Sequence, residues 1–220
     1  MRFLCVYSTL MKQMNIISNF AVFEGGDGSG TTSQLSLLEE RFRESGGPVF
    51  CPTFEPTTGP VGTLIRRALK KEIAVRPDTL AMLFATDRNE HLYGPDGIVQ
   101  RCSRGELVVC DRYVLSSLVY QGIECGDEVP QALNAAFPAP ELLLFFDLDP
   151  QIALERLQSR NSLDIFEYPE FQAKVRQKYR SLLDMYREAG VRVEIIDAEK
   201  SPPEVSSQVW SALSKMPILK

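Results

Sequence analysis

A short apolar run leads directly into a glycine-rich segment and then into an amphipathic stretch. The apolar run covers residues 20–23, the glycine-rich segment 25–30 and the amphipathic stretch 33–45. Gly25 and Gly30 have the spacing of the phosphate-binding motif G-x-x-x-x-G-K-[ST], which requires this order of strand, loop and helix. The backbone N–H groups of such a loop and the N-terminal end of the following helix bind phosphate oxygens. The segment therefore predicts an α/β fold whose first strand ends in an anion-binding loop.

The rest of the chain continues to alternate short apolar runs with longer amphipathic stretches. Apolar runs that predict further buried strands are 48–51, 107–110, 142–146 and 191–196. Helical periodicity predicts helices over 33–45, 61–71, 77–101, 152–159, 170–189 and 203–214, with a break near 93–95. Strands that alternate with helices form βαβ units with parallel strands and right-handed crossovers. We therefore expect a parallel sheet flanked by helices.

The domain organisation is expected to be simple. Residues 1–18 carry no motif, and we expect them to form an N-terminal extension that is disordered or that reflects a start codon assigned upstream of Met11 or Met14. No linker divides residues 19–220, so these are expected to form one domain, which suits a chain of 220 residues. No apolar run approaches the roughly 20 residues of a membrane-spanning helix.

Composition excludes several classes of protein. The 24 Lys and Arg residues against 29 Asp and Glu residues give a net charge of −5, which argues against a general nucleic-acid binder. With 44% apolar residues and 24% charged residues, the chain is not of the disordered class. Five cysteines without C-x-x-C spacing and a single histidine do not make a zinc pattern. The cysteines are therefore expected to be reduced thiols of a cytoplasmic protein.

The glycine-rich loop lacks the lysine of its motif. Thr31 stands at the lysine position and offers a neutral hydroxyl where an ammonium normally binds the β- and γ-phosphates. Thr32 stands at the next position, where a hydroxyl is expected to bind Mg²⁺. Taken alone, the loop is also compatible with a glycine-rich turn that binds no ligand.

A second polar pair follows the apolar run 107–110. Asp111 and Arg112 come directly after this predicted strand. Because ligands bind at the carboxyl ends of strands in open α/β sheets, Asp111 is expected to face Mg²⁺ and Arg112 to hold a phosphate. An ion pair at a strand end is the alternative interpretation of this dipeptide.

Six segments together resemble motifs of the thymidylate kinase family, in the P-loop group of nucleoside monophosphate kinases. They are FEGGDGSGTTSQ at 23–34, FEP at 54–56, GTLIR at 62–66, LFATDRNEH at 83–91, DRY and YQG at 111–113 and 120–122, and LDIFE at 163–167. The resemblance implies a five-stranded parallel sheet of order 2-3-1-4-5. It also implies phosphorylation of dTMP to dTDP with ATP and Mg²⁺ by a homodimer that binds neither nucleic acid nor membrane.

The resemblance assigns residues to the acceptor nucleotide. Phe84 would stack on the thymine ring, and Arg88, one helical turn further, would hydrogen-bond the edge of the base. Arg66 and Arg112 would hold the 5′-phosphate, for which the guanidinium fork is well shaped. The remaining residues assigned to dTMP are Asp27, Glu55, Ser116, Tyr120 and Gln121.

The resemblance also assigns residues to ATP and to the transfer step. The ATP phosphates would be bound by Gly25, Gly26, Asp27, Gly28, Ser29, Gly30, Thr31 and Thr32, with Arg156 and Arg160 from a short lid around 156–166. Thr32 and Asp111 would hold the metal ion. The catalytic residues would be Asp27, Asp111, Arg112 and Arg160.

The chain departs from the family motifs close to the phosphates. Besides Thr31, the departures are Ser33 for a threonine and, for arginines, Phe54, Gln158 and Ile165. The missing cations predict slow phosphoryl transfer and leave two alternatives open. One is a pseudo-kinase that binds thymidine nucleotides with little turnover. The other is a related deoxynucleoside or deoxynucleotide kinase, with Glu55 as the base for a 5′-hydroxyl; the extended matches favour the monophosphate.

Overall fold

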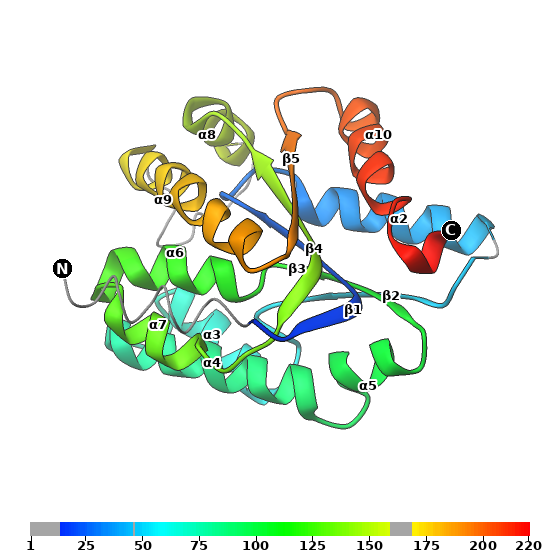
Figure 1. The fold of residues 1–220 in the computed structure, drawn as a ribbon. Coiled ribbons are helices and arrows are strands. Elements are labelled where there is room, and N and C mark those ends of the chain that lie inside the picture. Colours follow the sequence, from blue (N-terminus) through cyan, green and yellow to red (C-terminus); the bar gives the residue numbers. More distant parts are fainter. Residues whose placement is uncertain (1–13, 46, 159–168) are drawn as a thin grey trace.

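A central parallel sheet covered by helices on both faces forms the molecule in the computed structural model, which describes residues 14–45, 47–158 and 169–220 (Figure 1). The strands are β1 (Ile16–Gly25), β2 (Phe50–Phe54), β3 (Leu107–Asp111), β4 (Ala139–Asp147) and β5 (Arg192–Asp197). The helices are α2 (Thr31–Ser45), α3 (Pro60–Leu69), α4 (Pro77–Tyr93), α5 (Ile98–Ser103), α6 (Val114–Cys125), α7 (Glu128–Asn134), α8 (Pro150–Gln158), α9 (Pro169–Glu188) and α10 (Pro202–Leu213), followed by a 3₁₀ turn η2 (Pro217–Leu219).

The sheet has five strands in the order β2-β3-β1-β4-β5, and every pair is parallel. This confirms the predicted fold class and strand order. Phe23 pairs with Asp111 of β3 on one side and with Leu144 of β4 on the other. The loop after β1 and the end of β3 therefore lie level at the same edge of the sheet. Because the strand order reverses beside β1, a crevice for ligands is expected at this edge.

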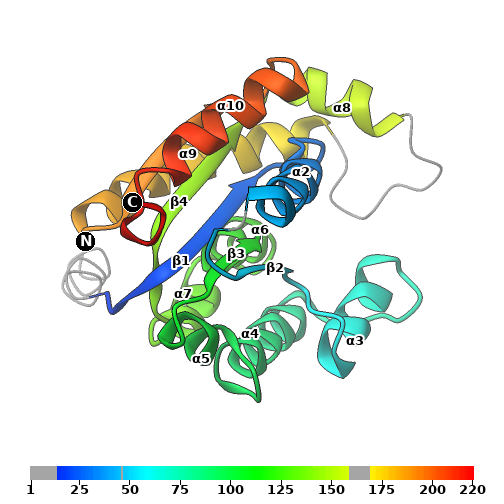
Figure 2. The same ribbon diagram turned by 90° about the vertical axis from the view of Figure 1, so that its right-hand side faces the viewer.

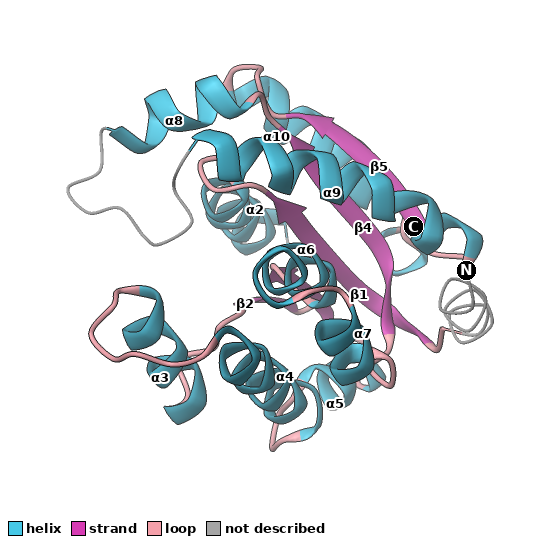
Figure 3. Ribbon diagram, turned by 90° about the vertical axis from the view of Figure 1, so that its left-hand side faces the viewer, coloured by secondary structure: helices cyan, strands magenta, loops and turns pink. Residues whose placement is uncertain are grey.

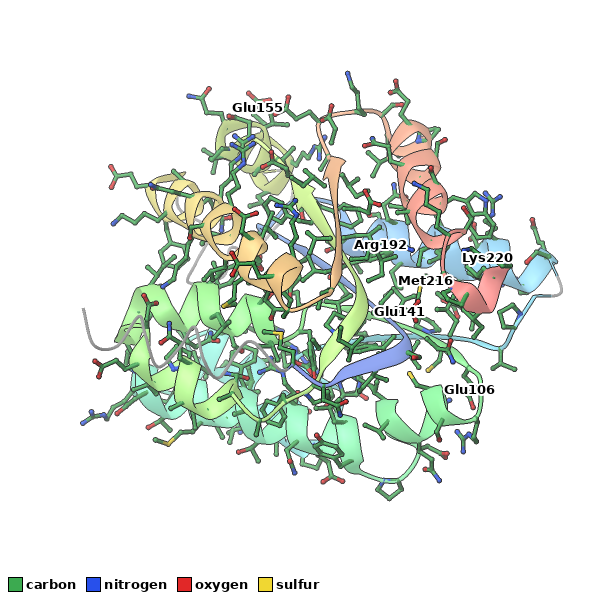
Figure 4. All side chains as sticks on the ribbon, in the orientation of Figure 1. Glu106, Glu141, Glu155, Arg192, Met216 and Lys220 are labelled. Atoms are coloured by element: carbon green, nitrogen blue, oxygen red, sulfur yellow. The ribbon has the colours of Figure 1, made fainter. Side chains whose placement is uncertain are left out.

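The two faces of the sheet are packed by different helices. Apolar residues of α2, α8 and α10 form one buried cluster, which the fully buried Met216 completes after α10 (Figure 4). Residues of α4, α5, α6 and α9 pack on the opposite face, which Figure 3 turns toward the viewer. Helix α3 packs beside α4, away from α5 and α7 (Figure 2). The pair α3–α4 thus stands beside the carboxyl ends of β2 and β3.

The structure corrects some of the sequence-based boundaries. Strand β1 begins at Ile16, so residues 16–18 belong to the domain rather than to an extension. The polar Ser18 and Asn19 hide this start, because the strand is irregular between Ile17 and Ala21 and Asn19 has φ +65°. Helices α6 and α7 were not predicted as helices. The break in the stretch 77–101 is confirmed, since α4 ends at Tyr93 and α5 begins at Ile98.

Two further expectations concern the thiols and the membrane. The cysteines of the described residues, Cys51, Cys102, Cys110 and Cys125, are free. Within the same residues, no helix is both long enough and apolar enough to cross a lipid bilayer.

Candidate active site

The glycine-rich loop connects β1 to α2 and has a backbone that only glycine adopts easily at several positions. Gly28 has φ +80° and Gly30 has φ +88°. A Cβ on Gly25 would lie 2.6 Å from Ser29 Oγ and 3.0 Å from the carbonyl oxygen of Phe146. Thr31 opens α2 and is buried, so a neutral side chain occupies the position of the motif's lysine. The loop therefore has the expected shape and lacks the expected cation.

Thr32 and Asp111 meet beside this loop. Thr32 Oγ1 donates a 2.6 Å hydrogen bond to Asp111 Oδ2. The other oxygen, Asp111 Oδ1, is buried and has no hydrogen-bond partner among the residues that the structure describes. A hydroxyl next to a carboxylate with a free oxygen is the hard-oxygen donor set that Mg²⁺ prefers. The two residues expected to hold the metal ion therefore lie together and fit it.

A cavity of about 390 Å³ opens at the same edge of the sheet. Its size is that of a small-molecule pocket. Thr32 and Asp111 line it, and so does every residue expected to contact the acceptor nucleotide: Asp27, Glu55, Arg66, Phe84, Arg88, Arg112, Ser116, Tyr120 and Gln121. Residues to which the sequence assigned no ligand contact complete the wall: Phe54, Pro56, Leu69, Tyr113 and Ser117. Segments far apart in sequence thus form one pocket beside the metal-binding pair.

Arg88 is held more firmly than its expected role as a base contact requires. Its side chain is 1% exposed. Arg88 Nε and Nη2 donate to Glu55 Oε2 at 3.0 and 2.7 Å, Nη2 also donates to Ser117 Oγ at 3.1 Å, and Nη1 donates to Asn134 Oδ1. Burial alone would lower the pKa of Arg88, but the Glu55 carboxylate and further acidic neighbours together outweigh burial and raise it. Four of the five N–H groups are therefore occupied, and one N–H on Nη1 has no partner among the described residues and remains for a ligand.

Glu55 lines the cavity, and both of its carboxylate oxygens are already hydrogen-bonded. Oε2 accepts from Arg88, and Oε1 lies 3.1 Å from His91 Nδ1. His91 Nε2 in turn lies 2.6 Å from Thr53 Oγ1. Cys110 Sγ lies near this pair and donates to the carbonyl oxygen of Arg112 at 3.0 Å. Although Glu55, His91 and Cys110 bring three ligand-type atoms within 4.8 Å of one another, these contacts already satisfy them as a hydrogen-bond network.

Gln121 differs from Glu55 because its acceptor is free. Gln121 is 2% exposed, and its Oε1 is buried without a hydrogen-bond partner among the described residues. An unpaired buried acceptor costs free energy, on the order of 1–3 kcal/mol, unless a ligand or water satisfies it. Since Gln121 lines the cavity, its Oε1 is placed to accept a hydrogen bond from a bound ligand.

Asp27 is the centre of a second polar cluster, at the other end of the cavity. Arg112 Nη2 donates to Asp27 Oδ1 at 2.7 Å, and Gln172 Nε2 donates to Asp27 Oδ2 at 2.8 Å. Burial raises the pKa of Tyr120, so its hydroxyl stays protonated and donates to Asp27 Oδ2 at 3.2 Å. Arg112 Nη1 also donates to the carbonyl oxygen of Gly25 at 3.0 Å. Arg112 thus joins the glycine-rich loop to the cavity, where a phosphate is expected.

Besides these wall residues, sequence reasoning missed two residues that hold the site together. Glu24 is fully buried and accepts hydrogen bonds from Tyr113 N (3.0 Å), Ser116 N (3.2 Å), Ser116 Oγ (2.6 Å) and Tyr179 OH (3.0 Å). Glu24 therefore fixes the first turn of α6. The sequence signal that could have revealed it is an acidic residue that continues an apolar strand. Gln172 also binds the backbone N–H of Asp27, at 3.3 Å. It lies far away in sequence, on α9, and no local pattern points to it.

Comparison with known proteins decides the family. The family model for thymidylate kinase matches residues 23–209. The chain belongs to the thymidylate kinase family. A "putative thymidylate kinase" of Treponema pallidum is 42% identical over 187 residues, which cover 84% of this chain and 89% of the relative. A "putative thymidylate kinase" of Aeropyrum pernix is 38% identical, with 86% and 95% covered, and a "probable thymidylate kinase" of Pyrobaculum aerophilum is 36% identical, with 90% and 97% covered.

The expected lid lies only partly within the described residues. Arg156 lies on α8, and its Nη1 is 3.5 Å from the carbonyl oxygen of Gly28 in the loop. Most of the expected lid, including Arg160 and Ile165, lies outside the described residues. Phe54 takes the place of a family arginine and is 45% exposed at the cavity wall. Arg156 is therefore the one expected lid cation whose contact with the loop can be described.

Proposed function

We propose that the protein transfers the γ-phosphoryl group of ATP to dTMP in the presence of Mg²⁺ and releases ADP and dTDP. The observation that carries the proposal is the single cavity described above. One end of it holds Thr32, Asp111 and Arg112 beside the glycine-rich loop, and its wall contains all residues expected to contact the acceptor. A donor phosphate at the loop and an acceptor phosphate in the cavity would therefore meet at Arg112.

The hydrogen-bonding groups of the cavity wall support a pyrimidine with an imide edge. Such an edge offers one N–H donor beside carbonyl acceptors. The free Gln121 Oε1 complements the donor, and the remaining N–H of Arg88 complements an acceptor. Phe84 is half-buried at the same wall and offers a flat apolar face for the ring. A cytosine edge would place an amino group against the Arg88 donor and would be disfavoured.

The phosphate end of the site is suited to alignment and neutralisation of charge, which is most of what phosphoryl transfer needs. When bound, Mg²⁺ neutralises charge on the transferred phosphoryl group. Thr32 and Asp111 would hold it through their oxygens. Arg112, fixed by Asp27 and Gly25, would keep its remaining N–H groups directed at the acceptor phosphate. Exclusion of water by the buried wall would favour transfer to dTMP over hydrolysis.

The hydrogen bonds that Glu55 already makes argue against a deoxynucleoside kinase. A base for a 5′-hydroxyl needs a free carboxylate oxygen within hydrogen-bond reach of that hydroxyl. Both oxygens of Glu55 are bound, by Arg88 and by His91. The carboxylate is therefore better suited to fix Arg88 than to accept a proton.

An assay of ADP release tests the proposal directly. Purified protein is mixed with ATP, Mg²⁺ and dTMP, and ADP is followed by a coupled reaction. We expect release that depends on dTMP, and dTMP should compete much better than thymidine for binding. Binding of dTMP without any ADP release would favour the pseudo-kinase, and a failure to bind dTMP would refute the proposal.

A homodimer and a cytoplasmic location also belong to the proposal, on the strength of the family resemblance. Within α4, Leu80 is part of the buried core, whereas Met82 is 51% exposed and available for a contact between subunits. Light scattering coupled to gel filtration would measure the mass in solution, and a monomer at all concentrations would refute the homodimer.

A further inference from the structure

Two neighbouring residues of α4 hold the two ends of the turn that follows β2. Arg88 binds Glu55 at one end. At the other end, Thr57 N donates to Asp87 Oδ2 and Thr57 Oγ1 donates to Asp87 Oδ1, both at 2.7 Å. Asp87 is 2% exposed. A buried carboxylate with two such bonds fixes the position of the segment that it holds.

The turn after β2, residues 55–57, also fixes the side chain of Arg66. The guanidinium donates from Nη1 to the carbonyl oxygen of Pro56 and from Nη2 to that of Thr57. Helix α3, which carries Arg66, is itself built on the turn. Gly59 N, at the N-terminal cap of α3, donates to Thr57 Oγ1 at 3.1 Å. A Cβ on Gly62 would lie 2.0 Å from the Thr57 carbonyl oxygen, so the helix packs directly against this residue.

We propose that Asp87 is a positioning residue for the 5′-phosphate of the acceptor nucleotide, acting through Thr57 and Arg66. The inference rests on the proposed function. Asp87 is absent from the residues that line the cavity, whereas Arg66 lines it and has N–H groups beyond the two that bind the turn. Asp87 therefore acts on the ligand through the guanidinium that it orients.

The arrangement also links the two halves of acceptor recognition. Phe84, Asp87 and Arg88 share one helix, so the same element holds the wall that faces the base and the turn that aims Arg66. A ligand that seats its base against α4 would meet a phosphate contact already in place. Preorganisation of this kind raises affinity because less order has to be created on binding.

The proposal predicts that a change at Asp87 weakens the binding of dTMP, which carries the 5′-phosphate, and not the binding of thymidine. In Asp87→Asn, an amide N–H faces one of the two donors of Thr57, so the turn loses a charge-assisted hydrogen bond. We expect the affinity for dTMP to fall about tenfold, the size of one such bond. The affinity for thymidine, which lacks the phosphate, and the KM for ATP should stay within about twofold. Calorimetry with dTMP and thymidine, together with steady-state kinetics, measures all three.

A second pair of variants separates positioning from folding. Thr57→Val removes the hydroxyl at nearly constant shape and should reproduce the loss for dTMP, whereas Thr57→Ser keeps the hydroxyl and should restore binding. Asp78→Asn makes the same substitution at a partly exposed position of the same helix and should leave both ligands unaffected. Thermal unfolding of each variant shows that the fold is retained.

The outcomes are distinct. Equal losses for dTMP and thymidine, or equal losses for Thr57→Ser and Thr57→Val, would overturn the positioning role. A wild-type protein that binds neither ligand would instead refute the proposed function, and the inference with it. A loss confined to dTMP in Asp87→Asn and Thr57→Val supports the role assigned to Asp87.

Discussion

Thr32 Oγ1 lies 2.6 Å from Asp111 Oδ2, and this hydrogen bond joins the first turn of α2 to the end of β3. The two residues are far apart in sequence, but parallel strands bring the loop after β1 level with the end of β3. The bond uses one carboxylate oxygen and leaves Asp111 Oδ1 buried and unpaired among the described residues. A buried, unpaired carboxylate oxygen beside a phosphate-binding loop is costly without a cation.

Asp111→Asn should therefore act mainly through the metal ion. An amide is a poorer Mg²⁺ ligand than a carboxylate, so we expect kcat to fall about 10²-fold, as for the loss of one preorganised charged group. The Mg²⁺ concentration needed for half-maximal rate should rise, and dTMP affinity should change little. Mg²⁺ titrations of the rate test this, with Thr32→Ser as the control that keeps the hydroxyl. An unchanged Mg²⁺ dependence would refute the metal site.

Phe84→Ala should weaken dTMP binding by about 1–3 kcal/mol through the loss of stacking. ATP binding should hardly change, because Phe84 lies in the acceptor cavity. Calorimetry with each nucleotide measures both effects, and Tyr93→Ala at an exposed position of the same helix is the control. Equal losses for the two nucleotides would mean that Phe84 supports the fold rather than the base.

The sequence predicted the strands and the pocket better than the roles of the pocket's residues. Apolar runs located the strands because buried parallel strands are nearly continuous in apolar residues. Glu55 and Arg88 were both placed in the pocket, but their mutual ion pair was not foreseen. A pairing between residues 33 positions apart depends on how α4 packs on β2, which no local pattern encodes. The same holds for Gln172 and Asp27, which meet across 145 positions.

Asp147, at the end of β4, should make stability depend on pH. Burial raises the pKa of Asp147, but the hydrogen bonds and the positive charges of Arg176 and Arg180 together outweigh burial and hold it below the ordinary 3.8. The ionised carboxylate therefore stabilises the fold above its unfolded-state pKa, and this contribution is lost as the pH falls through the lowered folded-state pKa.

The measurement is urea unfolding of wild type and Asp147→Asn at a series of pH values. The difference in unfolding free energy should be largest near neutral pH and should shrink below about pH 4. Asp184→Asn breaks an exposed pair with Arg187 and should show almost no difference at any pH. A constant difference for Asp147→Asn across this range would contradict the lowered pKa.

Thr31 is expected to limit the rate of phosphoryl transfer to dTMP. The hydroxyl of Thr31 cannot supply the charge that a lysine would place on the β- and γ-phosphates. The loss of one preorganised donor typically lowers kcat by about 10²–10³-fold, so turnover of dTMP should be measurable but slow. Arg160, which lies outside the described residues, is the expected compensating cation. Arg156 already lies near Gly28 O and makes a control for lid arginines in general.

Kinetics on the wild type, Thr31→Lys, Arg160→Ala, Arg156→Ala and the double variant Thr31→Lys with Arg160→Ala separate the contributions. Thr31→Lys should raise kcat at least tenfold, because the added ammonium stabilises charge that develops only during transfer. The Kd for dTMP should stay nearly constant, since the new charge lies at the donor phosphates. Arg160→Ala should be far more damaging in the wild type than beside Lys at position 31. If the wild type turns over dTMP rapidly and Arg160→Ala does not change its kcat, Arg160 does not compensate for the missing lysine. If the wild type shows no turnover and Thr31→Lys stays inactive, the pseudo-kinase is favoured.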